Sequence, residues 1–131
     1  MENPLEIVVV DDELIVRKRL KPALEKSGYN VEVYDDGSGV LKRLKEKSFD
    51  IVVTDVRMDD VDGIQVLEEV LAQSSRTKVI IITGYATVDV AREALAKGAF
   101  DFIAKPFKPN DLRVIIERAA EALLTERRQE G

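Results

Sequence analysis

The chain has 131 residues and a net charge of −5, and it contains neither cysteine nor histidine. This length suits one domain that buries a single hydrophobic core without covalent or metal support. Without cysteine there is no disulfide framework or thiolate metal site, and without histidine there is no phosphohistidine donor. The acidic balance argues against direct nucleic-acid binding, because phosphates require a basic surface.

The N-terminal segment MENPLEIVVVDDE has no basic region, and its apolar run is too short for a signal peptide or a membrane span. We therefore expect a soluble, cytoplasmic protein without a membrane partner. No low-complexity tract or linker interrupts the sequence. We expect a single domain over residues 1–131, with a folded core over about residues 5–125.

Five short segments rich in β-branched residues are predicted to be strands. They are LEIVVV (5–10), NVEVY (30–34), DIVVT (50–54), KVIIIT (78–83) and FDFIA (100–104). Because these runs are mostly apolar, they favour strands buried on both faces, as in a parallel sheet.

The intervals between the strands have the periodicity of helices. The first, from Glu13 to Ser27, ends before Gly28 and contains Pro22, where we expect a kink. The inward positions predicted for the first three helices are Val16, Leu20, Ala23 and Leu24, then Val40, Leu41 and Leu44, then Ile64, Leu67, Val70 and Leu71.

The fourth helix is predicted to begin at Thr87 as N-cap, to carry Val88, Ala91 and Leu95 inward, and to stop at Gly98. A last helix begins at Pro109 and is expected to fray over TERRQEG. Its apolar face is Leu112, Ile115, Ile116, Ala119, Leu123 and Leu124. Five strand–helix alternations predict a doubly wound α/β domain of flavodoxin-like (βα)5 type, with a five-stranded parallel sheet ordered 2-1-3-4-5.

Polar residues follow the predicted strands where ligands bind in such a sheet, at the carboxyl ends of the strands. Asp11, Asp12 and Glu13 follow the first strand, and Asp55 follows the third. The fourth strand ends in Thr83-Gly84, and the fifth is followed by Lys105-Pro106. Tyr34 and Asp35 follow the second strand, which is at the edge of the sheet in the predicted strand order, so we expect them to lie away from the centre of the site.

Converging carboxylates repel one another unless a cation lies among them, and Mg²⁺ prefers carboxylate and carbonyl oxygens. We expect Asp12 and Asp55 as direct Mg²⁺ ligands, Asp11 as a ligand through water, and the Arg57 backbone carbonyl as a further oxygen. With Mg²⁺, the Thr83 hydroxyl and the Lys105 ammonium provide groups for three phosphoryl oxygens. Asp55 then has an oxygen free to act as a nucleophile and form an aspartyl phosphate.

The segments VVVDDE, VVTDVRM, IITG and FIAKPF, in this order and spacing, resemble the receiver (CheY-like) domain of bacterial two-component response regulators. The segment TGYATVDVAREALAKGAFDFIAKPF is further similar to receivers of NtrC-type σ54-dependent activators. The resemblance covers nearly the whole chain. It implies transcription regulation as the wider setting, but no ATPase or DNA-binding region lies in these residues, so an output domain is expected to be absent from this chain.

The resemblance implies that Asp55 accepts phosphate from the phosphohistidine of a sensor histidine kinase, with Mg²⁺ required. It implies that Thr83 and Lys105 bind the phosphoryl group, that the Lys105–Pro106 bond is cis, and that Phe102 is the aromatic that moves inward with Thr83. The switching face would comprise the fourth helix, the fifth strand and the last helix, which is also a candidate homodimer surface. Such a domain is a signalling phosphoacceptor that promotes its own phosphorylation and dephosphorylation, not an enzyme with a separate substrate.

One position departs from the family pattern, which commonly has proline four residues after the acceptor. This chain has Asp59 there, so the loop from Met58 to Asp62 is expected to be looser and more acidic. Tyr85 and Arg57 flank the acceptor and are candidates for controlling water access. Asp59, Asp60 and Asp62 are interpreted as turn residues and N-terminal charges of the third helix.

Simpler interpretations exist for each residue taken alone. Asp11 and Asp12 suit a helix N-cap, Thr83 a strand-end hydroxyl, Lys105 a solvated lysine and Phe102 a core position. A calcium loop fails because Met58 stands where its first carboxylate is needed.

A haloacid-dehalogenase-type phosphatase needs a second aspartate where this chain has Arg57, and a flavodoxin needs hydroxyls where the first loop carries acids. No glycine-rich nucleotide loop is present. The remaining alternative is a receiver that is not phosphorylated and acts purely as an interaction module.

Overall fold

The computed structural model describes residues 4–58, 61–84 and 88–130. Over these residues, five parallel strands form one sheet in the order β2-β1-β3-β4-β5. The strands are β1 (Glu6–Val10), β2 (Asn30–Tyr34), β3 (Ile51–Asp55), β4 (Lys78–Thr83) and β5 (Asp101–Ala104). The predicted fold class and strand order are confirmed.

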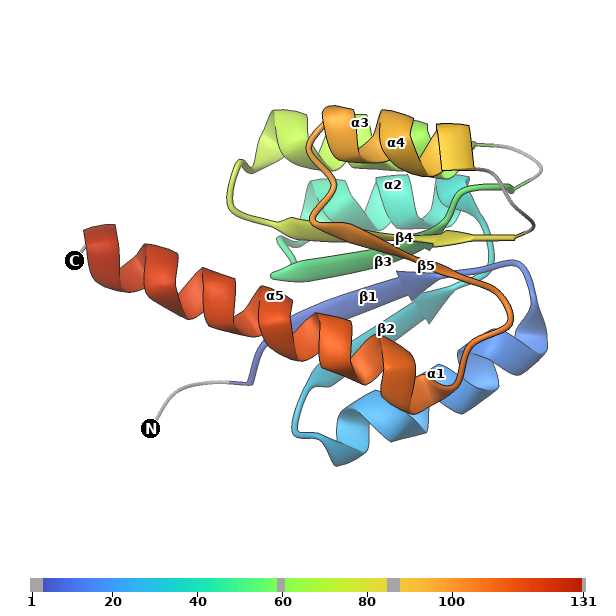
Figure 1. The fold of residues 1–131 in the computed structure, drawn as a ribbon, viewed down its shortest axis with the longest axis horizontal. Coiled ribbons are helices and arrows are strands. Elements are labelled where there is room, and N and C mark those ends of the chain that lie inside the picture. The colour runs from blue at the N-terminus through green and yellow to red at the C-terminus, as the bar shows by residue number, and fades with distance from the viewer. Residues whose placement is uncertain (1–3, 59–60, 85–87, 131) are drawn as a thin grey trace.

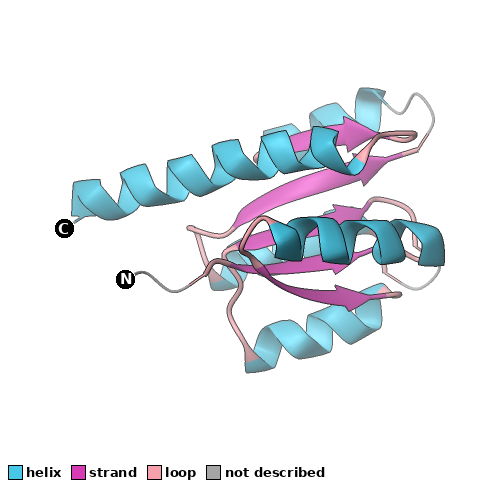
Figure 2. Cartoon of the chain, turned by 90° about the horizontal axis from the view of Figure 1, so that it is seen from below, coloured by secondary structure: helices cyan, strands magenta, loops and turns pink. Residues whose placement is uncertain are grey.

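Five helices cover the two faces of the sheet in the described part of the chain (Figures 1 and 2). They are α1 (Leu14–Lys26), α2 (Gly37–Glu46), α3 (Gly63–Gln73), α4 (Val88–Ala96) and α5 (Pro109–Glu130). Helices α1 and α5 lie on one face, and α2, α3 and α4 lie on the other (Figure 1). This is the doubly wound arrangement that right-handed crossovers produce.

Alternation along the central strands produces two separate cores. In β1, Ile7 and Val9 pack with α1 and α5, while Val8 and Val10 pack with α2, α3 and α4. All four side chains are fully buried. Because successive strand residues point to opposite faces, an uninterrupted apolar run fills both cores at once. The central strands are therefore rigid supports for the residues at their ends.

The first helix runs through Pro22 and ends at Lys26, with Gly28 at a positive φ of 96°. Gly98 likewise has a φ of 109° after α4. Both glycines occupy the left-handed conformation that ends helices. The predicted stops are thus confirmed, whereas the kink at Pro22 stays a prediction, and Thr87 lies outside the described residues.

Two details of the helices were predicted wrongly. Leu95 is 41% exposed, because α4 packs its small residues Ala91 and Ala94 against the sheet and turns Leu95 outward. The C-terminal segment does not fray, because α5 continues through Glu130. Ion pairs hold its last turns to the sheet, with Lys78 Nζ 2.7 Å from Glu126 Oε2 and Arg127 Nη2 3.2 Å from Asp50 Oδ1.

Among the described residues, no helix combines the length and the apolar character needed to cross a membrane.

Candidate functional site

The carboxyl ends of β1, β3, β4 and β5 meet at one edge of the sheet and bring the predicted site residues together. Asp55 is the last residue of β3 and pairs with Ile82 of β4. Asp11 directly follows β1, and its backbone N–H donates to the Tyr34 carbonyl of β2 at 3.1 Å. Thr83 ends β4, and Lys105 follows β5. The parallel sheet therefore gathers residues that are far apart in the sequence.

Lys105 is the cationic centre of the site. Its Nζ lies 3.0 Å from Asp11 Oδ2 and 3.1 Å from Asp55 Oδ2, and it also donates to the Glu13 carboxylate. Backbone geometry fixes the approach, because the Lys105 N–H donates to the Thr83 carbonyl at 2.7 Å. The Lys105–Pro106 peptide bond is cis, as the family resemblance implied. One ammonium thus faces three carboxylates.

The four acids at this edge form a cluster suited to a hard cation. One carboxylate oxygen from each of Asp11, Asp12, Glu13 and Asp55 lies within 4.8 Å of the others. Asp11 is fully buried, and its Oδ2 accepts no hydrogen bond within the described structure although Lys105 lies beside it. A buried carboxylate oxygen that accepts no well-formed hydrogen bond keeps a lone pair for a metal ion or its water. The donor set therefore fits Mg²⁺.

The charges of the site perturb one another. Burial raises the pKa of Asp11, and the neighbouring Asp55 charge adds to this, while the Glu13 backbone N–H and Lys105 oppose it. Partial burial alone would lower the pKa of Lys105, but its hydrogen bonds to Glu13 and Asp11 and the charges of Asp11 and Asp55 raise it overall. Lys105 is therefore a permanent cation near neutral pH.

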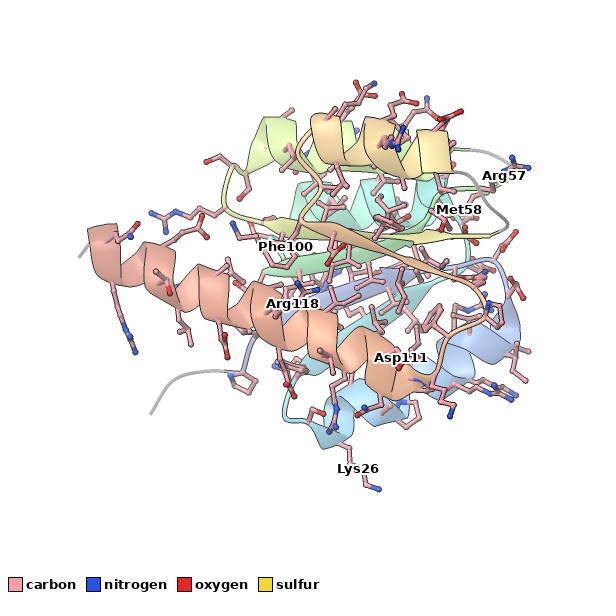
Figure 3. The ribbon with its side chains drawn as sticks, viewed as in Figure 1. Lys26, Arg57, Met58, Phe100, Asp111 and Arg118 are labelled. Atoms are coloured by element: carbon pink, nitrogen blue, oxygen red, sulfur yellow. The ribbon has the colours of Figure 1, made fainter. Side chains whose placement is uncertain are left out.

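Asp55 is held by the start of the loop that follows it. The Arg57 backbone N–H donates to Asp55 Oδ1 at 3.2 Å, and Lys105 contacts Oδ2. The Asp55 side chain is 8% exposed, so one part of it still reaches solvent. Arg57 lies at the same edge of the molecule with its guanidinium directed away from the sheet (Figure 3). The open cleft over Asp55 is lined by Asp12, Glu13, Arg57, Gly84, Lys105 and Pro106.

The Thr83 hydroxyl and the Phe102 ring occupy neighbouring strands. Thr83 is 2% exposed, and its Oγ1 donates to the Ile103 carbonyl at 3.5 Å, a long contact. Phe102 is 38% exposed on the edge strand β5, so the interpretation of Phe102 as a simple core residue is wrong. The pattern in FDFIA did not reveal this, because an edge strand presents alternate residues to solvent even where the run is mostly apolar.

Asp62 begins α3 as its N-cap. Its side chain accepts from the Gln65 N–H at 2.8 Å, and the Gln65 side chain accepts from the Asp62 N–H at 3.0 Å, which forms a capping box. The helix-start role of Asp62 is confirmed. Asp59, Asp60 and Tyr85 lie outside the described residues.

The sequence did not predict the contact of Glu13 with Lys105 or the close packing of Gly63. Gly63 donates its backbone N–H to the Val56 carbonyl at 2.9 Å and packs directly behind Asp55. A Cβ on Gly63 would lie 2.4 Å from the Asp55 carbonyl oxygen and 2.8 Å from Val56 Cα. The sequence carried a signal for this role, because a glycine directly follows the N-cap aspartate. Helix position N1 does not itself require glycine, so a close contact at Gly63 could have been inferred.

The fold and the acidic edge define a flavodoxin-like α/β domain with a cluster of four acidic residues at its strand ends. A profile of the family described as response regulator receiver domain matches residues 7–117. Regulatory protein AtoC of Escherichia coli (strain K12) is 39% identical over 115 residues, which cover 88% of this chain and 25% of AtoC. Transcriptional regulatory protein FixJ of Bradyrhizobium diazoefficiens is 41% identical over 113 residues, or 86% of this chain and 55% of FixJ.

Among solved structures, the beryllofluoride-activated NtrC4 receiver domain dimer is similar, with a TM-score of 0.84 and 35% identity. The match covers 90% of this chain and 98% of that one. The chain belongs to the response regulator receiver domain family of two-component systems. It spans about a quarter of AtoC and about half of FixJ.

Gly63→Ala is predicted to destabilise the domain, because the added methyl group overlaps the backbone that carries Asp55. We expect a loss of about 1–3 kcal/mol in the free energy of unfolding, the usual range for overpacking. Gly84→Ala is the matched control, since a Cβ at Gly84 meets no atom of the described residues within 4 Å. Urea unfolding of both variants measures the difference. Equal stabilities of the two variants would show that Gly63 does not constrain the end of β3.

Proposed function

We propose that the chain is a phosphoacceptor in which Asp55 receives a phosphoryl group from the phosphohistidine of a sensor histidine kinase. The observation that carries this proposal is the placement of Asp55 at the end of a buried strand, 3.1 Å from Lys105 Nζ and within the acid cluster. One carboxylate thus combines a rigid position, a neighbouring cation and access to solvent. These are the requirements for a carboxylate nucleophile.

The reaction is an in-line displacement at phosphorus. An Asp55 carboxylate oxygen forms the new O–P bond as the P–N bond to the donor histidine breaks, and the nitrogen keeps the electron pair. Lys105 and the Thr83 hydroxyl would bind phosphoryl oxygens. Both belong to strand ends, so the transfer needs little reorganisation of the backbone.

The residues that would hold Mg²⁺ are Asp12, Asp55 and the Arg57 backbone carbonyl, with Asp11 acting through water. The cluster of four acids and the buried Asp11 Oδ2 support this assignment. The bound ion would offset the charge of the carboxylates and of the phosphoryl group.

The chain would act on no separate substrate, and its chemistry would be limited to gaining and losing its own phosphate. It would work as one receiver domain over its whole length, with a core of about residues 5–125. The alternative is a receiver that is not phosphorylated and serves only as an interaction module. Phosphorylation of the purified chain distinguishes the two functions.

Incubation with acetyl phosphate and Mg²⁺ is predicted to add one phosphate to the wild type and none to Asp55→Asn. The amide nitrogen cannot attack phosphorus as the carboxylate does, and the substitution keeps the shape of the residue. Intact mass spectrometry measures the adduct. Asp50→Asn, at the opposite end of β3, is the control and should be phosphorylated normally. An adduct of similar yield on Asp55→Asn would contradict the assignment.

The phosphate would alter the surface formed by α4, β5 and α5. Each of these elements carries an exposed large apolar side chain, namely Leu95, Phe102 and Val114. Phe102 of β5 pairs with Ile81 of β4, two residues before Thr83, so movement of the Thr83 hydroxyl toward phosphate would open space near the ring. This surface would contact an output domain, a partner or a second copy of the chain, and NtrC4 is described as a receiver domain dimer.

Beryllofluoride with Mg²⁺ is predicted to shift backbone NMR signals mainly between Thr83 and Phe107, because the switch couples the site to β5. The mimic should shift the population between two conformations of one unit, which comprises Thr83, Phe102 and the helices α4 and α5. Thr83→Val, which removes the hydroxyl and keeps the shape, should bind the mimic at Asp55 less tightly, and at saturating mimic it should show smaller shifts at Phe102. Shifts confined to α1 and α2 would contradict this route.

A further inference from the structure

Glu13 occupies the N-cap of α1 without capping it. N-cap side chains usually accept from the first backbone N–H groups of the helix, but the Glu13 side chain makes no such bond. Its carboxylate instead accepts a hydrogen bond from Lys105, 92 residues away in the sequence. The Glu13 backbone N–H donates to Asp11 Oδ1 at 2.8 Å, which ties the loop to the acid cluster.

Lys105 is therefore shared among partners of different kinds. Asp11 and Asp55 are buried, with side-chain exposures of 0% and 8%, whereas the Glu13 side chain is 53% exposed. A half-exposed carboxylate is easily rehydrated when it separates from its partner. Glu13 is thus the partner that Lys105 can release at the smallest cost.

An ammonium group has three N–H bonds, and all three are directed to carboxylates in this site. A phosphoryl group on Asp55 would need at least one of them. The cleft over Asp55 is lined by Glu13 and Lys105 together, so an incoming phosphoryl group meets the pair.

We propose that Glu13 is a positioning residue that holds Lys105 and competes with the phosphoryl group for its ammonium. The proposal rests on the phosphoacceptor function of Asp55. Glu13 sets how readily Lys105 becomes available, and it lowers the affinity of the site for the phosphoryl group. Among the three acids that pair with Lys105 in the described structure, only Glu13 can be released in this way, because Asp11 is enclosed and Asp55 is the proposed acceptor itself.

The test is the dissociation constant for beryllofluoride at saturating Mg²⁺, measured by NMR titration of the wild type, Glu13→Gln and Glu13→Asp. Glu13→Gln removes the charge and keeps the length, so it frees Lys105 and should bind about three- to fivefold more tightly, the upper range for an exposed ion pair. Glu13→Asp keeps the charge but is one methylene shorter. It should also bind more tightly, because it reaches Lys105 poorly.

Glu25→Gln, near the other end of α1, is the matched control for a loss of one negative charge and should bind as the wild type does. The ¹⁵N signal of the Lys105 ammonium is a second readout, which should change in Glu13→Gln before any beryllofluoride is added.

Equal affinities of the wild type and Glu13→Gln would overturn the inference while leaving the proposed function intact. Tighter binding by Glu13→Gln together with wild-type affinity in Glu13→Asp would also overturn it, since charge alone would then explain the effect. Failure of the wild type itself to bind at Asp55 would overturn the proposed function and the inference with it.

Discussion

The burial of like charges beside the Lys105 ammonium is the constraint on which the rest of this domain depends. The side chains of Asp11 and Asp55 are 0% and 8% exposed, and both contact Lys105. Two unit charges about 4 Å apart interact by about 4 kcal/mol at an effective dielectric constant near 20. A domain is stabilised by only about 5–15 kcal/mol in total, so this repulsion must be offset locally. Lys105 offsets part of this repulsion, and the oxygens of the acid cluster could hold a divalent cation that offsets more of it.

The fold tolerates this arrangement because its strands are supported from both sides. Apolar residues of β1, β3 and β4 fill two cores, and the parallel direction of the strands places every functional group at the same edge. Gly63 allows α3 to begin directly against the Asp55 carbonyl. Asp55 is therefore fixed by packing, while the neighbouring residues Glu13 and Arg57 remain at the surface. The strand ends thus fix the positions of the site residues, whereas the exposed loops carry the side chains that can change partners.

Much of this organisation could be predicted from the residues themselves. Uninterrupted β-branched runs separated by helical periods allow few folds, and strand-end positions then identify Asp11, Asp55, Thr83 and Lys105. The errors arose where local pattern and packing differ. Leu95 fits an inward period, but Ala91 and Ala94 allow a closer approach to the sheet. The last turns of α5 form ion pairs with Lys78 and Asp50, which are distant in sequence. Glu13 was recognised as a strand-end acid, but its contact with Lys105 depends on a loop conformation that no local pattern encodes.

The most direct test of the central claim is thermal unfolding of the wild type and Asp12→Asn across a magnesium series at constant ionic strength, which separates specific binding from screening. Asp12 is exposed and lies within the acid cluster, so removing its charge relieves repulsion without opening a cavity. Asp35→Asn, an exposed aspartate after β2, serves as the control. The account predicts that Asp12→Asn melts above the wild type without Mg²⁺, while the wild type gains stability with Mg²⁺ and the variant gains little. An Asp12→Asn variant that melts below the wild type in the absence of metal would show that the carboxylates are not in mutual repulsion, and would contradict the account.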